Sequence, residues 1–323
     1  YICSPKDLRY KKLIELEDKV KTIPVTAFKR FDLPAKLKFG FNFIRGYFVS
    51  RRIIRKFKPD VVIGVGGYVS GAPLMVVRNK KKIKKILLEQ NTLPGAVNRF
   101  FSKYADLTIL TFESSKKWIK GKAETIGNPV LLEKTQETET KGREFFNVGK
   151  DDFVLTIMGG SLGAKIINDT MTEVVKHFKN VKIIWSTGPD HADKIKEATK
   201  DLENVQVYPF INNMEQLLSI TDLMVSRAGA TSIAEICYMG VPAIMIPYKY
   251  SSGNHQVLNA KFVVEGGGGE MIEEDELKAK ELKDRINFYI NNREELSKKK
   301  INIQSLFDKD VTSLIINRIK KEI

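Results

Sequence analysis

A glycine-rich turn at residues 159–164 joins an apolar run to a segment with helical spacing. Residues 152–158 are mostly β-branched or apolar, and apolar side chains then recur from Ile166 to Phe178 at intervals of three and four. This order predicts a strand, a tight turn and a helix. Backbone N–H groups in such a turn point toward an anion above the carboxyl end of the strand. Two interpretations are open: a phosphate site, or glycines that only let the helix pack closely on the strand.

The spacing of this turn differs from that of a dinucleotide site. Its glycines do not follow the pattern G-x-G-x-x-G, and the next apolar run, residues 181–188, ends without an acidic residue to hold an adenosine ribose. The pattern therefore argues against NAD.

A second glycine turn, at residues 227–230, begins a helical segment that carries a carboxylate. Glu235 lies on the second turn of this predicted helix, and Gly240 ends it. N–H groups at the start of a helix suit a diphosphate, and a carboxylate one turn along can accept two hydrogen bonds from the vicinal hydroxyls of a ribose. A uridine diphosphate would satisfy both, but Glu235 could equally be a surface residue paired with a lysine.

Two further groups of polar side chains are candidates for substrate contact or catalysis. His255, Gln256 and Asn259 lie where a loop becomes a helix, and amide side chains both donate and accept hydrogen bonds, as sugar hydroxyls require. In the first half of the chain, the apolar run at residues 85–91 ends in Glu-Gln-Asn. Polar residues at the carboxyl end of a buried strand are candidates for catalysis.

The segment at residues 33–57 is predicted to be a basic amphipathic helix. Its large apolar residues recur at helical spacing among many lysines and arginines: Leu37, Phe41, Ile44, Tyr47 and Phe48. This pattern suits an interfacial contact with an anionic membrane. It also suits a helix whose apolar side packs in the core.

Strands and helices alternate in both halves, which predicts two doubly wound α/β domains facing each other across a cleft. We expect an N-terminal Rossmann-like domain at residues 1–130, a polar linker at 131–150, a second Rossmann-like domain at 151–307 and a C-terminal helix at 308–323 that packs back on the first domain. Other expected elements are a helix at 6–19, a strand at 20–28, a helix at 113–119 and a loop at 266–269. Tyr1-Ile-Cys3 resembles the end of a strand, so we expect a preceding strand, loop and helix of roughly 30 residues.

Composition narrows the classes of function. The chain has 323 residues, 42% of them apolar, and a net charge of +15, which favours an anionic partner. Cys3 and Cys237 show no metal spacing and suit a reducing compartment. The sequence contains no nucleophile elbow, P-loop or zinc pattern and no apolar run of membrane-spanning length.

Taken in order, these segments resemble the UDP-N-acetylglucosamine-dependent transferases of bacterial peptidoglycan synthesis, a family with the GT-B glycosyltransferase fold. The resemblance runs from about residue 58 to 260. It rests on GGYVSG at 66–71, EQN at 89–91, PG at 94–95, NR at 98–99, GNPV at 127–130, GGSLGA at 159–164, Asn168, RAGA at 227–230, Glu235, Gln256 and Asn259.

The resemblance implies which residues bind the two substrates. The donor, UDP-N-acetylglucosamine (UDP-GlcNAc), would lie mainly on the second domain, with Ser161 at the diphosphate, Glu235 at the ribose, Arg227 near the nucleotide and Gln256 at the sugar hydroxyls. The full donor set is Asn128, Gly160, Ser161, Gly163, Asn168, Arg227, Ala230, Glu235, His255, Gln256 and Asn259. The acceptor, lipid I (undecaprenyl-pyrophosphoryl-MurNAc-pentapeptide), would lie near Tyr68, Glu89, Asn91 and Asn98. Leu37, Phe41, Ile44 and Tyr47 would form the membrane patch.

The family's N-terminal glycine-rich loop with its histidine is absent from this sequence. Leu88 and Leu131 replace a usual histidine and a frequent arginine, and His255 replaces a common glutamine. These departures concern details of substrate contact and not the class.

The implied reaction is inverting transfer of N-acetylglucosamine to the C4 hydroxyl of the muramoyl sugar of lipid I, giving lipid II at the cytoplasmic face of the bacterial membrane. Glu89 is a candidate base, and no cofactor or protein-bound metal is expected. Alternatives are a related GT-B glycolipid synthase or nucleotide-sugar epimerase. A nucleic-acid-binding protein is supported only by the charge, and the chain lacks aromatic stacking motifs, so no nucleic acid partner is expected.

Overall fold

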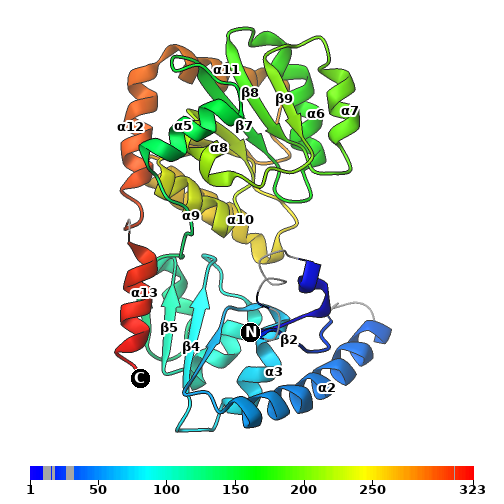
Figure 1. The fold of residues 1–323 in the computed structure, drawn as a ribbon, viewed down its shortest axis with the longest axis vertical. Helices are drawn as coiled ribbons and strands as arrows, with labels where there is room; N and C mark the ends of the chain where they lie inside the picture. Colours follow the sequence, from blue (N-terminus) through cyan, green and yellow to red (C-terminus); the bar gives the residue numbers. More distant parts are fainter. Residues whose placement is uncertain (10–15, 17–18, 27–32, 309) are drawn as a thin grey trace. The chain divides into compact units, whose positions relative to one another are not determined.

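The computed structural model describes residues 1–9, 16, 19–26, 33–308 and 310–323, and the chain forms two compact units (Figure 1). Unit 1 comprises Tyr1–Gly127 and Ser313–Ile323, and unit 2 comprises Asn128–Thr312. Unit 1 therefore takes in the C-terminal end of the chain.

Unit 1 is built on a four-stranded parallel sheet in the order β3, β4, β5, β6. A separate pair of parallel strands, β1 and β2, completes its β-structure among the described residues. The strands are β1 (Ile2–Cys3), β2 (Lys21–Thr22), β3 (Val61–Gly64), β4 (Lys84–Glu89), β5 (Leu107–Leu110) and β6 (Ala123–Thr125). The helical elements are η1 (Pro5–Arg9), α2 (Leu33–Phe57), α3 (Gly67–Val77), α4 (Ala96–Phe101), η3 (Ser102–Tyr104) and η4 (Glu113–Trp118).

Helix α2 has the bounds that the sequence pattern predicted, and it packs on α3 (Figure 1). Ile54 from α2 joins Val76 and Val77 from α3 in a buried cluster, with Tyr47 packed against its side. One side of α2 thus belongs to the core of unit 1.

Unit 2 contains a six-stranded parallel sheet in the order β12, β11, β10, β7, β8, β9. Its strands are β7 (Phe153–Met158), β8 (Val181–Ser186), β9 (Val205–Tyr208), β10 (Leu223–Ser226), β11 (Ala243–Met245) and β12 (Gly269–Met271). From β7 the chain adds strands on one side, and from β10 it adds them on the other. The order therefore reverses between β7 and β10, and open α/β sheets bind their ligands at such a switch point.

Helices cover both faces of this sheet. They are α5 (Gln136–Phe145), α6 (Lys165–Val174), η5 (Val175–His177), α7 (Ala192–Ala198), α8 (Met214–Ile220), α9 (Ala230–Met239), η6 (Ser252–Asn254), α10 (His255–Glu265), α11 (Ala279–Asn291) and α12 (Arg293–Gln304). Alternation along β7 divides the core, because Leu155 and Ile157 pack in a cluster with α6 and α11, whereas Val154 packs with residues of α8. Burial on both faces explains why the strands are almost wholly apolar.

The final helix, α13 (Val311–Lys320), attaches the end of the chain to the sheet of unit 1. Arg318 donates two hydrogen bonds to Glu124 of β6, at 2.5 and 2.8 Å. Glu322 accepts from Arg318 and pairs with Lys122. These contacts hold α13 beside β6 of unit 1.

Several elements differ from the expectation. The segment expected to be a linker contains α5, which packs against α8 (Figure 1). Thr135 and Thr138 form a capping box at the start of α5. A Cβ on Gly142 of α5 would lie 2.4 Å from the Gln216 carbonyl oxygen, so glycine allows this close contact. The expected loop at 266–269 ends in the strand β12, and the helix expected at 113–119 is the 3₁₀ element η4.

Parts of two other predictions lie outside the described residues. The helix expected at 6–19 is described only as η1 and as residues 16 and 19, and the strand expected at 20–28 is described up to residue 26, with β2 at its start. No helix among the described residues is long and apolar enough to cross a membrane.

Candidate functional site

The turn after β7 combines close packing with an open tip. Gly160 and Gly163 have φ values of +91° and +76°, which other residues rarely adopt. A Cβ on Gly163 would lie 2.0 Å from the Thr187 carbonyl oxygen at the end of β8, so this glycine is required for packing. Nothing lies within 4 Å of a Cβ on Gly160, and Ser161 and Leu162 are exposed. The packing interpretation thus holds for Gly163, and the open tip at Gly160 leaves room for the predicted phosphate.

Asn168 on α6 fixes this turn to the neighbouring strand. Its Nδ2 donates to the Thr187 carbonyl at 2.8 Å, and its Oδ1 accepts from the Trp185 indole Nε1 at 3.1 Å. The side chain is buried. These contacts give Asn168 a positioning role and disfavour the predicted direct contact with substrate.

The turn after β10 leads into α9, whose N-cap is Gly229 and whose first residue is the buried Ala230. Glu235 lies on the second turn of α9 and is partly buried, and this burial raises the pKa of its carboxyl above the ordinary value. Within the described part of the chain, no side chain or backbone N–H is hydrogen-bonded or ion-paired to that carboxylate. The alternative of a surface glutamate paired with a lysine does not fit this environment.

Arg227 links the two loops that follow β10 and β11. Its guanidinium donates to the Ile246 carbonyl at 3.0 Å, pairs with Glu274 at 2.5 Å and lies over the Tyr248 ring, 5.4 Å from the centroid. Glu274 is not predicted from the sequence, because no motif marks a single buried carboxylate in a connecting segment. These protein contacts of Arg227 disfavour a direct contact with the nucleotide, and its predicted place near the nucleotide stays a prediction.

The start of α10 connects to the same loops. The buried Asn259 donates from Nδ2 to the Ala228 carbonyl at 3.2 Å, and Gln256 accepts at Oε1 from the Tyr248 N–H at 2.9 Å. The His255 Nδ1 lies 2.9 Å from the Ser252 carbonyl oxygen. Of the three predicted residues, Gln256 keeps an amide group, Nε2, without a hydrogen bond to any described residue.

Asn128, at the start of unit 2, also lies close to α9. It is buried and lines a small pocket with Ala234 and Tyr238, so it is near the helix that carries Glu235. The structure therefore brings the other predicted donor residues of unit 2 to the carboxyl edge of one sheet, in the turns after β7 and β10 and on the helices α6, α9 and α10, and it places Asn128 beside α9.

In unit 1, Glu89 at the end of β4 organises the loop that follows. Its carboxylate accepts from the Asn91 N–H at 3.0 Å and Nδ2 at 3.4 Å, from the Gly95 N–H at 3.0 Å and from the Asn98 Nδ2 at 2.9 Å. A carboxylate offers about four lone-pair sites. Because four donors occupy them and the residue is buried, this geometry disfavours Glu89 as the base that takes a substrate proton.

Tyr68 and Asn98 lie beside this loop. Tyr68 is exposed on the first turn of α3. Its ring packs edge-on against the Phe39 ring, with the two ring centroids 6.0 Å apart. The turn before it approaches the buried Asn98, since a Cβ on Gly66 would lie 3.3 Å from the Asn98 Nδ2. The predicted acceptor residues therefore gather at the carboxyl ends of β3 and β4.

The outer side of α2 presents an apolar stripe, defined here as Leu37, Phe41, Ile44 and Phe48. Their exposed fractions are 71%, 61%, 58% and 59%. Exposed cations surround the stripe, and the Arg45 guanidinium lies 5.6 Å from the Phe41 ring centroid. Tyr47, predicted to belong to this patch, is only half-exposed and packs against the core cluster. Within unit 1 the stripe is therefore not core.

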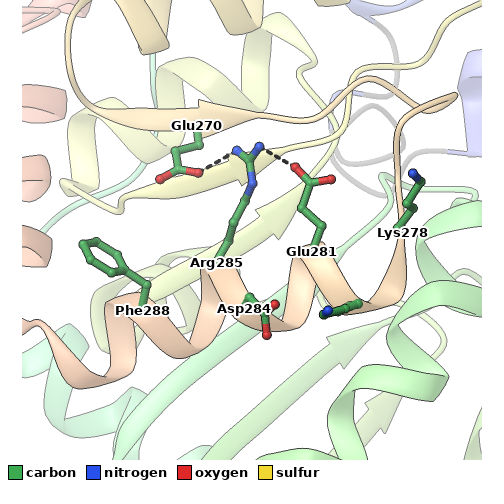
Figure 2. Close-up of a pocket in the computed structure, with 7 residues that line it drawn as sticks. Glu270, Lys278, Glu281, Asp284, Arg285 and Phe288 are labelled. Carbon is green, nitrogen blue, oxygen red and sulfur yellow. Dashed lines mark hydrogen bonds and ion pairs between the residues drawn. The ribbon is translucent and has the colours of Figure 1, made fainter.

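A pocket of about 420 Å³ lies in unit 2 beside β12 and α11 (Figure 2). Figure 2 shows Arg285 between two carboxylates, Glu270 at 2.7 Å and Glu281 at 2.6 Å. Tyr289 also donates to Glu270. The pocket contains none of the predicted substrate residues, and three of its charged groups, Glu270, Glu281 and Arg285, pair with one another. In the described ranges, no group of three or more His, Cys, Asp or Glu residues is arranged to hold a metal ion.

Known proteins resemble this chain along most of its length. The profile of the glycosyltransferase family 28 N-terminal domain matches residues 1–109, and that of the family 28 C-terminal domain matches residues 154–315. The structure is similar to that of MurG from Acinetobacter baumannii, with a TM-score of 0.75 and 23% identity over 99% of this chain and 90% of that one. These matches define a two-domain α/β glycosyltransferase with the GT-B fold.

A relative from Bacillus cytotoxicus identifies the particular family. It is 36% identical over 307 residues, 93% of this chain and 84% of the relative, and is named UDP-N-acetylglucosamine–N-acetylmuramyl-(pentapeptide) pyrophosphoryl-undecaprenol N-acetylglucosamine transferase. The chain belongs to the family of these transferases, within glycosyltransferase family 28. The resemblance noted in the sequence is thereby confirmed.

A UDP-GlcNAc 2-epimerase from Neisseria meningitidis is also similar in structure. Its TM-score is 0.71 at 14% identity, over 99% of this chain and 91% of that one. Identity this low establishes a shared fold and gives no support to an epimerase activity.

Proposed function

We propose that this chain transfers N-acetylglucosamine from UDP-GlcNAc to the C4 hydroxyl of the muramoyl sugar of lipid I, with inversion, releasing UDP and forming lipid II. Its family membership supports this reaction. The structural observation that carries the donor assignment is Glu235, a partly buried carboxylate one turn after the start of α9 that has no hydrogen-bond or ion-pair partner among the described residues.

On this proposal, unit 2 binds the donor at the switch point of its sheet. The open tip at Gly160 and Ser161 and the first N–H groups of α9 receive the diphosphate, and Glu235 accepts hydrogen bonds from the ribose hydroxyls. N–H groups and helix N-termini aimed at the diphosphate stabilise the charge that grows on UDP as the bond to the sugar breaks. Gln256 donates from Nε2 to a hydroxyl of the sugar.

Unit 1 binds the acceptor beside the loop that Glu89 holds. Tyr68 is exposed there, and Asn91 is held by its neighbour Glu89. Glu89 itself acts mainly by positioning Asn91, Gly95 and Asn98, since its lone pairs are taken. The role of Glu89 as the base stays a prediction, and the four hydrogen bonds to its carboxylate disfavour it.

We further propose that the protein docks peripherally on the cytoplasmic face of the bacterial membrane through the apolar stripe of α2. Exposed apolar side chains bordered by cations suit the boundary between acyl chains and anionic headgroups. Lipid I is anchored in that membrane, so docking would bring unit 1 to its substrate.

The test is UDP release from UDP-GlcNAc by the purified protein, with and without a soluble lipid I analogue. We expect release that depends on the acceptor. Release without acceptor would contradict the transferase and favour hydrolysis or an epimerase-like reaction. Binding of UDP with no release under either condition would contradict lipid I as the acceptor.

A further inference from the structure

The loop after β11 carries two tyrosines whose rings face solvent. Tyr248 is 42% exposed and Tyr250 is 73% exposed. Their ring centroids lie 5.8 Å apart and the planes meet at 70°, so the two rings form an angled aromatic surface. Large aromatic side chains this exposed on one short loop call for a specific role.

Both rings are held in place by cations that are themselves fixed. Arg227, paired with Glu274, lies over the Tyr248 ring. The Lys249 Nζ lies 5.2 Å from the Tyr250 ring centroid and pairs with Asp275 at 2.6 Å. These cation–π contacts cover part of each ring and restrain it, which lowers the entropy cost of binding a ligand on the remainder.

The loop is also tied to the donor residues. The Tyr248 N–H donates to the Gln256 Oε1 at 2.9 Å, and the Lys249 N–H donates to Glu274 at 3.3 Å. The first bond places the Gln256 amide beside the backbone of Tyr248, with Nε2 left to donate elsewhere. Because β11 is parallel to β10, this loop lies at the same edge of the sheet as the start of α9.

We propose that the rings of Tyr248 and Tyr250 form the surface on which the pyranose ring of the donor sugar packs, with Gln256 donating to a hydroxyl of that sugar. An N-acetylglucosamine ring has equatorial substituents, so its faces present C–H groups that suit an aromatic surface while its edge presents hydroxyls. This inference rests on the proposed function and adds residues that select for the sugar part of the donor.

Calorimetric titration with UDP-GlcNAc and, separately, with UDP tests the proposal. Tyr250→Ala should weaken UDP-GlcNAc binding about tenfold and leave UDP binding unchanged, because UDP lacks the sugar. Tyr250→Phe should bind both ligands as the wild type does, since it keeps the ring. Phe145→Ala, which removes an exposed ring from α5 of the same unit, is the matched control and should change neither affinity.

Two outcomes would overturn the inference, and a third would refute the proposed function. Equal weakening for UDP and UDP-GlcNAc in Tyr250→Ala would show that the ring contacts the nucleotide or only supports the loop. Unchanged binding of both ligands in Tyr250→Ala and in Tyr248→Ala would make the rings ordinary surface. A wild-type protein that fails to bind UDP-GlcNAc at all would instead refute the proposed function on which the inference depends.

Discussion

Replacing Glu235 tests the donor site, because the free protein and its complex should respond in opposite directions. In the complex, the carboxylate is proposed to accept two hydrogen bonds from the ribose, each worth about 1.5–3 kcal/mol for a charged acceptor. Taking the lower value for both, Glu235→Ala should cost about 3 kcal/mol of binding free energy, or about 100-fold in the Kd for UDP. In the free protein, the carboxylate is partly desolvated and no described residue pairs with it. Its removal should therefore leave the free energy of unfolding unchanged or raise it.

The pH dependence follows from the raised pKa of Glu235. A folded-state pKa above the unfolded value means that the folded protein binds the proton more tightly. The contribution of Glu235 to stability is thus fully present below the ordinary glutamate pKa and is lost as the pH rises through the raised value. UDP binding requires the ionised carboxylate, so affinity should fall as the pH drops through that same raised value. Glu235→Gln should remove both dependences.

The assay is calorimetric titration of UDP at several pH values, together with thermal unfolding of each variant without ligand. Glu173→Ala, at an exposed position on α6 of the same unit, is the control for loss of one negative charge. A Kd for UDP unchanged in Glu235→Ala would refute the ribose assignment. A fall of several degrees in Tm would show that Glu235 stabilises the free protein. That result would contradict the inference from its partial burial with no partner among the described residues.

The remaining predictions concern Glu89, the α2 stripe and Gly163. Glu89→Gln should lower both Tm and turnover, because the new NH₂ group would face buried N–H donors and each unsatisfied group costs about 1–3 kcal/mol of folding free energy. Lost turnover at an unchanged Tm would instead make Glu89 the base. Phe41→Asp with Ile44→Asp should abolish sedimentation with anionic vesicles while UDP binding persists. Phe288→Asp on unit 2 is the control. Retained sedimentation of the double variant would contradict membrane docking through the stripe. Gly163→Ala should weaken UDP binding and lower Tm, because a Cβ would lie 2.0 Å from a carbonyl oxygen at a φ of +76°; native values of both would contradict the requirement for close packing in this turn.

The elements predicted best from the sequence are those in which buried faces set the spacing of apolar residues. The buried strands of unit 2 and the long helix α2 were recognised from apolar spacing, which reflects the faces that they bury. Helix α5 was missed because its residues are largely polar, and the capping by Thr135 was not recognised as the start of a helix. Strand β12 was missed because its run of glycines is typical of a loop. The structure shows that they permit contact, since a Cβ on Gly269 would lie 2.4 Å from the Ala243 carbonyl oxygen.

The sequence marks candidate site residues without showing which contacts they make. A motif marks an asparagine or a glutamate without showing which way its polar atoms point. Asn168 and Asn259 direct their amides to backbone carbonyls, and Glu89 directs its carboxylate to backbone and amide donors. These contacts depend on segments up to 31 residues apart, so spacing alone cannot distinguish a residue that binds substrate from one that shapes the loop.

The pattern of satisfied and unsatisfied polar groups in unit 2 separates the two kinds of residue. Arg227 and Asn259 direct donors to backbone carbonyls or to a buried carboxylate, and these bonds hold the loops after β10 and β11 together with the start of α10. Leaving a buried polar group unpaired is costly, so such groups normally find partners within the protein. Glu235 is partly buried and has no such partner in the part of the chain that the structure describes. Gln256 accepts at Oε1, whereas its Nε2 has no hydrogen bond to any described residue. Polar groups left without a hydrogen bond on loops that are otherwise fixed are the ones to which a ligand would hydrogen-bond. The Glu235 carboxylate would accept from a ribose diol, and the Gln256 Nε2 would donate to a sugar hydroxyl.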